Sequence, residues 1–203
     1  LDTLRHSCAH LLAQAVTELF PSARYGVGPA LETGFYYDFL VEKPFTPEDL
    51  EAISRRMKAL AKAGVPVERL DWSRDEALAY FAEKGQYLKV ELIEEKVDGE
   101  RVSLYRQGGF VDLCRGPHVP DTSLLRHFAL TSVAAAYWKG DQRNASMQRI
   151  YGVVFPSQEA LDAHLTFLKE VQARDHRRLG KDLDLFSLHE EAGPGLVYWH
   201  PKG

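Results

Sequence analysis

The stretch HFALTSVAAAYWKGDQRNASMQRIYGVVF, residues 127–155, decides the fold class of this chain. Three runs in it, residues 127–133, 135–139 and 148–155, have the composition of β-strands. Strands that follow one another this closely in sequence can pair antiparallel through short connections. The stretch therefore predicts an antiparallel sheet near the middle of the chain.

Further strands and four helices are expected around this stretch. An Asp98-Gly99 turn between alternating runs at 87–94 and 102–106 favours a hairpin. Thr46 before Pro47 and Gly64 after Ala63 indicate the start and end of a helix. The other expected strands are 24–31, 34–41, 65–70 and 109–113, and the other expected helices are 2–20, 73–84 and 157–179.

These elements predict an α+β fold, with an antiparallel sheet, helices packed on one face of it, and a long C-terminal linker helix. The aperiodic tail, residues 180–203, is interpreted as a linker. The expected division is a first domain at 1–156, a linker helix and connector at 157–192, and the start of another domain at 193–203.

Composition limits the classes of protein to consider. The 203 residues are 45% hydrophobic and 27% charged, and no apolar run approaches the length of a membrane span. Two cysteines are too few for a disulfide framework, and the N-terminus lacks the pattern of a secretory signal, so we expect a cytoplasmic protein. Without an initial Met, the chain is expected to be a piece of a longer protein. The net charge of −4 predicts at most local contact with a nucleic acid.

Two pairs of residues have the spacing of metal ligands or catalytic groups. His6 and His10 are one helical turn apart and lie nearly opposite the apolar stripe of their helix, which argues against two buried structural histidines. A solvated helix face is the alternative. Cys114 and His118 repeat the spacing after an expected strand, and the four residues together would make a zinc-like donor set. Cys114 packed in a turn is the alternative to that reading.

Other residues have weaker signals. Asp112 is a candidate to orient a ligand or to hold a substrate ammonium group. Lys89 is expected on the polar face of the strand 87–94. Of the adjacent Tyr36 and Tyr37, one ring is expected in the core and the other against a base. Cys8 points to the apolar stripe and is expected to be a core residue.

Several strings together resemble the editing domain of bacterial-type threonyl-tRNA synthetases, over essentially the whole chain. They are His6-Ser7-Cys8-Ala9-His10, Gly34-Phe35-Tyr36-Tyr37-Asp38, Asp112-Leu113-Cys114-Arg115-Gly116-Pro117-His118 and Ala136-Tyr137-Trp138. The segments 174–186 and 193–201 are similar to the linker helix and to the first residues of the class II catalytic domain of those ATP-dependent enzymes.

The resemblance implies a function. The family's synthetic pocket admits serine, because the one missing methyl group is worth only about 1–3 kcal/mol, and a second site hydrolyses the wrong ester. Catalytic residues would be His6, Lys89, His10, Cys114 and His118, with Asp112 and either Tyr37 or Tyr36 binding the substrate. The implied partners are the 3′ end of threonine tRNA carrying serine, and the catalytic and anticodon-binding domains of the parent enzyme, with no membrane.

Three alternatives are open at this stage. In a metal-free route, favoured by the resemblance, His6 and Lys89 activate a water. In a metal-dependent route, His6, His10, Cys114 and His118 hold zinc, as the related alanyl-tRNA editing proteins do. Outside editing, the chain would be a zinc hydrolase of a small molecule or a non-catalytic tRNA-binding module, of which the negative net charge disfavours the second.

Overall fold

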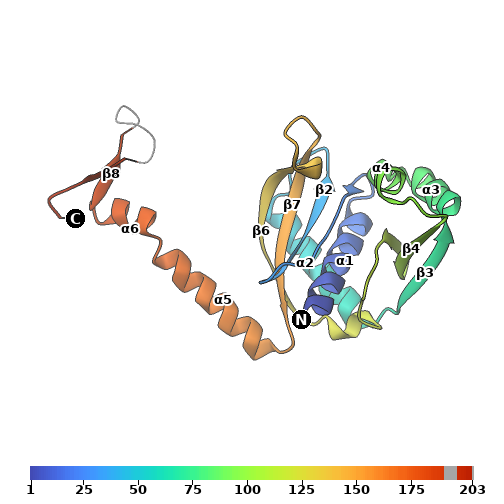
Figure 1. Ribbon diagram of the computed structural model, residues 1–203. Coiled ribbons are helices and arrows are strands. Elements are labelled where there is room, and N and C mark those ends of the chain that lie inside the picture. The colour runs from blue at the N-terminus through green and yellow to red at the C-terminus, as the bar shows by residue number, and fades with distance from the viewer. Residues whose placement is uncertain (190–195, 203) are drawn as a thin grey trace. The chain divides into compact units, whose positions relative to one another are not determined.

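The computed structural model describes residues 1–189 and 196–202 and divides the chain into two compact units, Leu1–Ser157 and Gln158–Gly203 (Figure 1). Each unit has its own secondary structure. The predicted boundary at 192/193 lies outside the described residues, as does the beginning of the segment 193–203. Among the described helices, none is both long and apolar enough to cross a membrane.

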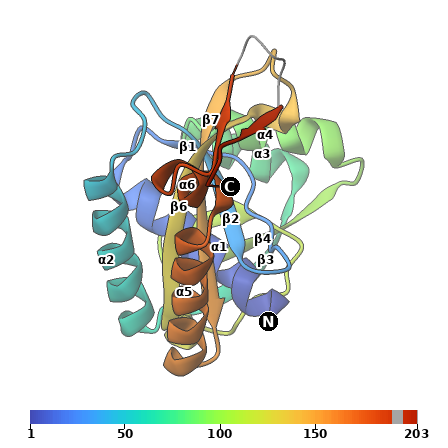
Figure 2. The same cartoon turned by 90° about the vertical axis from the view of Figure 1, so that its left-hand side faces the viewer.

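The first unit contains a four-stranded antiparallel sheet in the order β1-β2-β7-β6. Two helices, α1 and α2, pack against each other and contact this sheet, and Figures 1 and 2 show both on the same face of it. The bounds are β1 Arg24–Tyr25, β2 Phe35–Leu40, β6 His127–Tyr137, β7 Ser146–Phe155, α1 Asp2–Leu19 and α2 Pro47–Ala63.

A second antiparallel sheet, in the order β3-β4-β5, belongs to the same unit and lies on the other side of α1 (Figure 1). Because α1 is packed between two sheets, every residue from 7 to 16 is buried, including the face that carries His10. The bounds are β3 Val67–Ser73, β4 Arg101–Gln107, β5 Phe110–Leu113, α3 Arg74–Glu83, α4 Tyr87–Lys96, and the short 3₁₀ helices η1 Thr122–Leu124 and η2 Trp138–Gly140.

The second unit consists of α5 Gln158–Ala173, α6 His176–Asp182 and a hairpin of β8 Phe186–Leu188 with β9 Val197–Trp199. His200 joins the hairpin to the segment before it, because its ring nitrogens lie 2.7 Å from Asp184 Oδ1 and 2.9 Å from Ser187 Oγ. The single helix expected at 157–179 was therefore wrong in part, because α5 ends at Ala173 and α6 begins at His176. Part of the tail that was interpreted as a linker pairs as a hairpin.

The capping signals predicted helix ends well. Thr46 Oγ1 accepts from the backbone N–H of Asp49, and Gly64 ends α2 in the left-handed conformation at φ 64°. Ser73 and Glu76 form the same reciprocal arrangement at the start of α3. The α+β class is confirmed, although the antiparallel strands of the first unit form two sheets rather than one.

The expected strand at 87–94 was wrong, because these residues form α4. The alternation of Leu88, Val90 and Leu92 favoured a strand, yet the buried residues are Leu88, Lys89, Leu92 and Ile93, which is the spacing of one helix face. The expected hairpin partner, β4, pairs with β3 and β5 instead. Elsewhere, the strands expected at 127–133 and 135–139 are one strand with a bulge at Leu130/Ser132, and the strand at 24–31 shortens to β1.

Candidate active site

The structure brings the two pairs of predicted residues together. His6 and His10 come from the first turns of α1, while Cys114 and His118 follow the end of β5. Each of the four offers one ligand-type atom, and these atoms all lie within 4.8 Å of one another. Cys114 Sγ is 3.2 Å from His6 Nε2 and 3.1 Å from His118 Nε2. The predicted convergence is therefore present, whereas the roles of the residues stay predictions.

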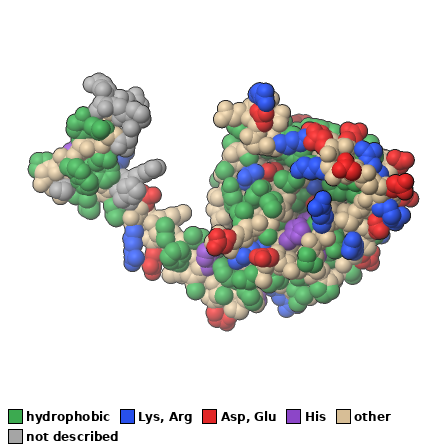
Figure 3. All heavy atoms as spheres, in the orientation of Figure 1, with side chains coloured by type: hydrophobic (Ala, Val, Ile, Leu, Met, Phe, Trp, Pro, Cys, Tyr) green, Lys and Arg blue, Asp and Glu red, His purple; other side chains and the backbone are tan. Residues whose placement is uncertain are grey.

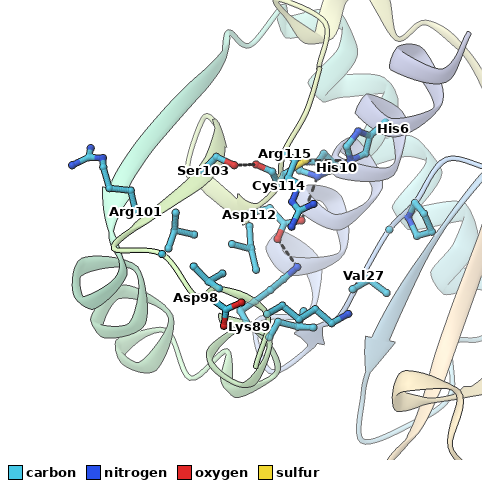
Figure 4. Close-up of a pocket in the computed structure, with 18 residues that line it drawn as sticks. His6, His10, Val27, Lys89, Asp98, Arg101, Ser103, Asp112, Cys114 and Arg115 are labelled. Atoms are coloured by element: carbon cyan, nitrogen blue, oxygen red, sulfur yellow. Dashed lines mark hydrogen bonds and ion pairs between the residues drawn. The ribbon is translucent and has the colours of Figure 1, made fainter. Parts of the chain in front are cut away.

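The cluster borders a cleft of about 810 Å³ between α1, α4, the β4–β5 sheet and the loop before β2 (Figure 4). His6, His10 and Cys114 line it on one side, and Val27, Pro29 and Leu92 are among its apolar residues. Lys96, Arg101 and Arg115 add positive charge. On the face of the first unit that Figure 3 shows, Lys and Arg side chains lie next to exposed histidine atoms. A ligand in the cleft meets imidazoles, apolar side chains and cations together.

A buried ion pair lies beside the histidines. Lys89 Nζ is 2.5 Å from Asp112 Oδ1 and donates to Tyr37 Oη at 3.1 Å, and Tyr37 in turn donates to Asp112 Oδ2 at 2.5 Å. All three side chains are buried, with Lys89 only 2% exposed. The ammonium thus forms an ion pair with Asp112 and donates one hydrogen bond, to Tyr37, among the described residues. Lys89 also lines the cleft, so the ammonium can donate to a ligand there.

The helical form of α4 explains how Lys89 reaches this position. Leu88 and Leu92 pack with Trp138 and Met147 in a small separate core, which holds one side of the helix. Glu91, on the same helix, accepts hydrogen bonds from Trp138 Nε1 and from Lys139 Nζ. These contacts fix α4 on the first sheet, and the Lys89 side chain extends from it toward Asp112 (Figure 4).

Burial keeps the imidazoles neutral. It lowers the pKa of His10 well below its usual value, and the charges of His6 and Lys89 lower it further. Burial likewise lowers the pKa of His118 to about 2. It also lowers the pKa of His6, and the negative charge of nearby Asp112 partly offsets that decrease. The pKa of Cys114 rises to about 11 because its thiolate would be desolvated. Near neutral pH the cluster therefore holds three uncharged rings.

Three imidazoles and a thiol fit zinc by donor type. With metal–ligand bonds of about 2.0–2.3 Å, neighbouring donors of a tetrahedral site lie about 3.5 Å apart, close to the two sulfur–nitrogen distances given above. His6, His10, Cys114 and His118 are the residues that would hold the ion. Zinc held there would supply Lewis-acid activation of a bound water.

The two tyrosines differ in position. Tyr37 is completely buried, so its ring is not open to stacking, and its hydroxyl serves Asp112 and Lys89. Tyr36 alternates to the opposite side of β2, where the Arg149 guanidinium lies 3.8 Å from its ring centroid. The structure therefore does not bring Tyr36 to the cleft, and the expectation that one of these rings stacks on a base has no support in the geometry.

Cys8 is fully buried in the main core, as its place on the apolar stripe predicted. We expect Cys8→Ala to lower the free energy of unfolding by about 1 kcal/mol with little effect on the cleft. Cys114→Ala is the matched change and should instead impair the chemistry of the cleft, because Cys114 contacts two imidazoles. Thermal unfolding and activity of both variants check this. Loss of activity in a folded Cys8→Ala protein would show that the face of α1 had been misjudged.

Sequence reasoning missed Ser7 and the cations of the cleft. Ser7 is fully buried, and its Oγ lies 3.1 Å from His118 Nδ1. A serine inside an apolar helix, next to a candidate histidine, was the available signal. Lys96 and Arg115 are distant in sequence, and nothing in their sequence neighbourhood predicted a shared site. They line the same cleft only because α4 packs near the segment that follows β5.

Comparisons with known proteins point to one group of relatives. The family described as "Threonyl and Alanyl tRNA synthetase second additional domain" matches residues 102–151, which include Asp112, Cys114 and His118. Threonine–tRNA ligases of Dechloromonas aromatica and Laribacter hongkongensis are each 57% identical to the chain over its whole length, and that of an Azoarcus species is 56% identical. Over its whole length the chain is thus similar to one part of threonine–tRNA ligases. It spans 32% of the length of these threonine–tRNA ligases.

The segment that matches the second additional domain accounts for only part of the cleft. The match at 102–151 covers β4 to β7 in large part, whereas His6, His10 and Lys89 come from outside it. The cleft is thus completed by α1 and α4, which pack against the matched segment.

Proposed function

We propose that the cleft carries out post-transfer editing in a threonine–tRNA ligase, by hydrolysing the ester that joins serine to the terminal adenosine of threonine tRNA. The observation that supports this most is one cleft with three neutral imidazoles, a thiol and a buried Lys89–Asp112 pair. It lies in a chain whose relatives are threonine–tRNA ligases. A cytoplasmic location follows from this substrate.

In the proposed reaction, a water positioned between His6 and Lys89 attacks the ester carbonyl. His6 takes a proton from the water, and its low pKa keeps it in the basic form beforehand. The Lys89 ammonium then donates to the oxyanion of the tetrahedral intermediate. Collapse of the intermediate breaks the bond to the ribose oxygen, which takes up the proton held by His6, and the new carboxylic acid of serine releases its own proton to solvent.

Asp112 has two parts in this proposal. It holds the Lys89 ammonium in place through the ion pair, with Tyr37 fixing the second carboxylate oxygen. Its remaining lone pairs can accept from the α-ammonium of serine, since Asp112 also lines the cleft. Specific recognition of an aminoacyl group, rather than any ester, would come from this contact.

The tRNA end would meet the other residues of the cleft. Because Tyr37 is buried and Tyr36 does not line the cleft, we place the terminal adenosine against Val27, Pro29 and Leu92. Lys96 and Arg115 are exposed and line the cleft, where they can contact phosphates. These local cations fit a protein of net charge −4, which binds a tRNA end rather than a long stretch of backbone.

The direct test is release of free serine from serine-charged threonine tRNA. We propose the metal-free route, so excess chelator should leave the rate unchanged. If chelator stops the reaction and zinc restores it, the four-residue donor set acts through the metal instead. If the chain binds the charged tRNA and releases nothing, the non-catalytic binding module is the better description.

Threonine is expected to be spared because its methyl group disturbs the water, rather than because it fails to enter. A cleft that accepts the hydroxyl of serine can accept that of threonine too, since the two hydroxyls differ only in the adjacent methyl. Structures with non-hydrolysable seryl and threonyl adenosine analogues check this: both should bind in the same place, with the water displaced only by threonine. Exclusion of the threonyl analogue from the cleft would favour plain steric rejection.

A further inference from the structure

Ser7 has an unusual hydrogen-bond environment for a helical serine. Thr17, on the same helix, bonds back to the carbonyl oxygens of Ala13 and Gln14. Ser7 makes no such bond to the described backbone. Its Oγ has two neighbours, the backbone nitrogen of Val119 at 3.0 Å and His118 Nδ1 at 3.1 Å.

These two contacts determine where the hydroxyl hydrogen lies. The Val119 N–H can only donate, so Ser7 Oγ accepts there. Ser7 is fully buried, and His118 Nδ1 is the remaining partner for its hydrogen among the described residues. A buried hydroxyl donates where it can, so Ser7 donates to Nδ1. The Nδ1 atom then carries no hydrogen, and the single hydrogen of the ring is on Nε2.

The Nε2–H of His118 points to Cys114, whose Sγ lies 3.1 Å away. The sulfur also accepts from the backbone N–H of Gly116 at 3.2 Å. With two donors directed at the sulfur, its own hydrogen is left for His6 Nε2, the third neighbour, at 3.2 Å. The hydrogen bonds therefore run in one direction, from Ser7 through His118 and Cys114 to His6.

We propose that Ser7 is a positioning residue, which fixes His118 in the Nε2–H tautomer, so that this hydrogen points to Cys114 Sγ and the thiol hydrogen points to Nε2 of His6, whose ring is also hydrogen-bonded to the backbone of Pro117. In the proposed reaction, the water takes the place of the thiol hydrogen at Nε2 of His6. The tautomer stands on these contacts alone; its effect on hydrolysis rests on the proposed function. Ligation of zinc by His118 Nε2 would require the hydrogen to move to Nδ1 and the Ser7 hydroxyl to turn. With these contacts, the Nε2 atom of His118 donates a hydrogen bond and is not free to ligate an ion.

The test is ¹⁵N NMR of histidine side chains in the metal-free chain, with His118 identified by its loss in His118→Gln. The wild-type protein should show Nδ1 unprotonated and Nε2 protonated. Ser7→Ala should lose this preference, Ser7→Thr should retain it because the hydroxyl remains, and Thr17→Ala is the matched control on the same helix, expected to be unchanged. A hydrogen on Nδ1 in the wild type, or the same tautomer in Ser7→Ala, would overturn the proposal.

Activity adds a separate measurement. Loss of a group that orients a functional histidine typically lowers activity about 10- to 100-fold, so Ser7→Ala should release serine more slowly by that factor, with Ser7→Thr restored toward wild type. An unchanged rate in a Ser7→Ala protein that has lost the tautomer would overturn the catalytic part. If the wild type shows the tautomer and no hydrolysis, the proposed function fails while the tautomer stands.

Discussion

Lys89→Met is expected to lower the single-turnover rate of serine release about 100- to 1,000-fold, the usual effect of removing one donor to an oxyanion. Methionine fills the space of the lysine stem but donates no hydrogen bond. Binding of the tRNA end should change little, since Lys89 is buried and its ammonium is engaged by Asp112 and Tyr37. The measurement is a quench series with enzyme in excess over serine-charged tRNA.

This variant needs a stability control. Breaking a buried ion pair by removing one partner leaves a buried charge and destabilises by about 3–5 kcal/mol. Lys89→Met should therefore unfold at a lower temperature, while Lys89→Met combined with Asp112→Asn should recover part of the loss. A slow rate in folded Lys89→Met with unchanged binding would keep Lys89 in the chemical step; the double variant is a stability control alone, because Asp112 is also proposed to bind the substrate. A normal maximal rate with weaker, less salt-dependent binding would make it a phosphate contact instead.

His6→Ala is expected to lower the same rate about 100- to 10,000-fold, the range for loss of a general base. His6 is half-buried at the cleft, so its removal opens space for a small base. Added imidazole should then restore part of the rate in His6→Ala and none in Lys89→Met, where the base is intact. Full activity without His6 would move the base elsewhere in the cluster.

Much of the cluster could be predicted from the sequence because its parts are local. His6 and His10 are one turn apart on a helix, so this pair shares a direction whatever the rest of the fold does. Cys114 and His118 have the spacing of metal ligands, but they lie in the irregular segment after β5, so their convergence depends on the path of that segment. Cap residues predicted α2 and α3 for the same reason: Thr46 and Ser73 bond to groups three residues away.

The remainder depends on tertiary packing. Lys89 was a candidate through the resemblance alone, since its segment was expected to be a strand with the lysine on the polar face, and it is a helix instead. The packing of Leu88 and Leu92 against Trp138 and Met147, about 50 residues later in the chain, favours a helix over the local alternation. The role of Ser7 also depends on tertiary packing, because it requires the contact with His118. The position of Tyr36 depends on which face of β2 borders the cleft, and alternation along the strand directs Tyr36 away from it.

The measurement that tests the central claim most directly compares serine-charged and threonine-charged threonine tRNA under single-turnover conditions, in excess chelator. The account predicts rapid release of serine and release of threonine that is slower by about 10- to 200-fold or more, the discrimination typical of one methyl group. Equal rates for the two esters, or no release from the serine ester by the folded chain, would contradict it.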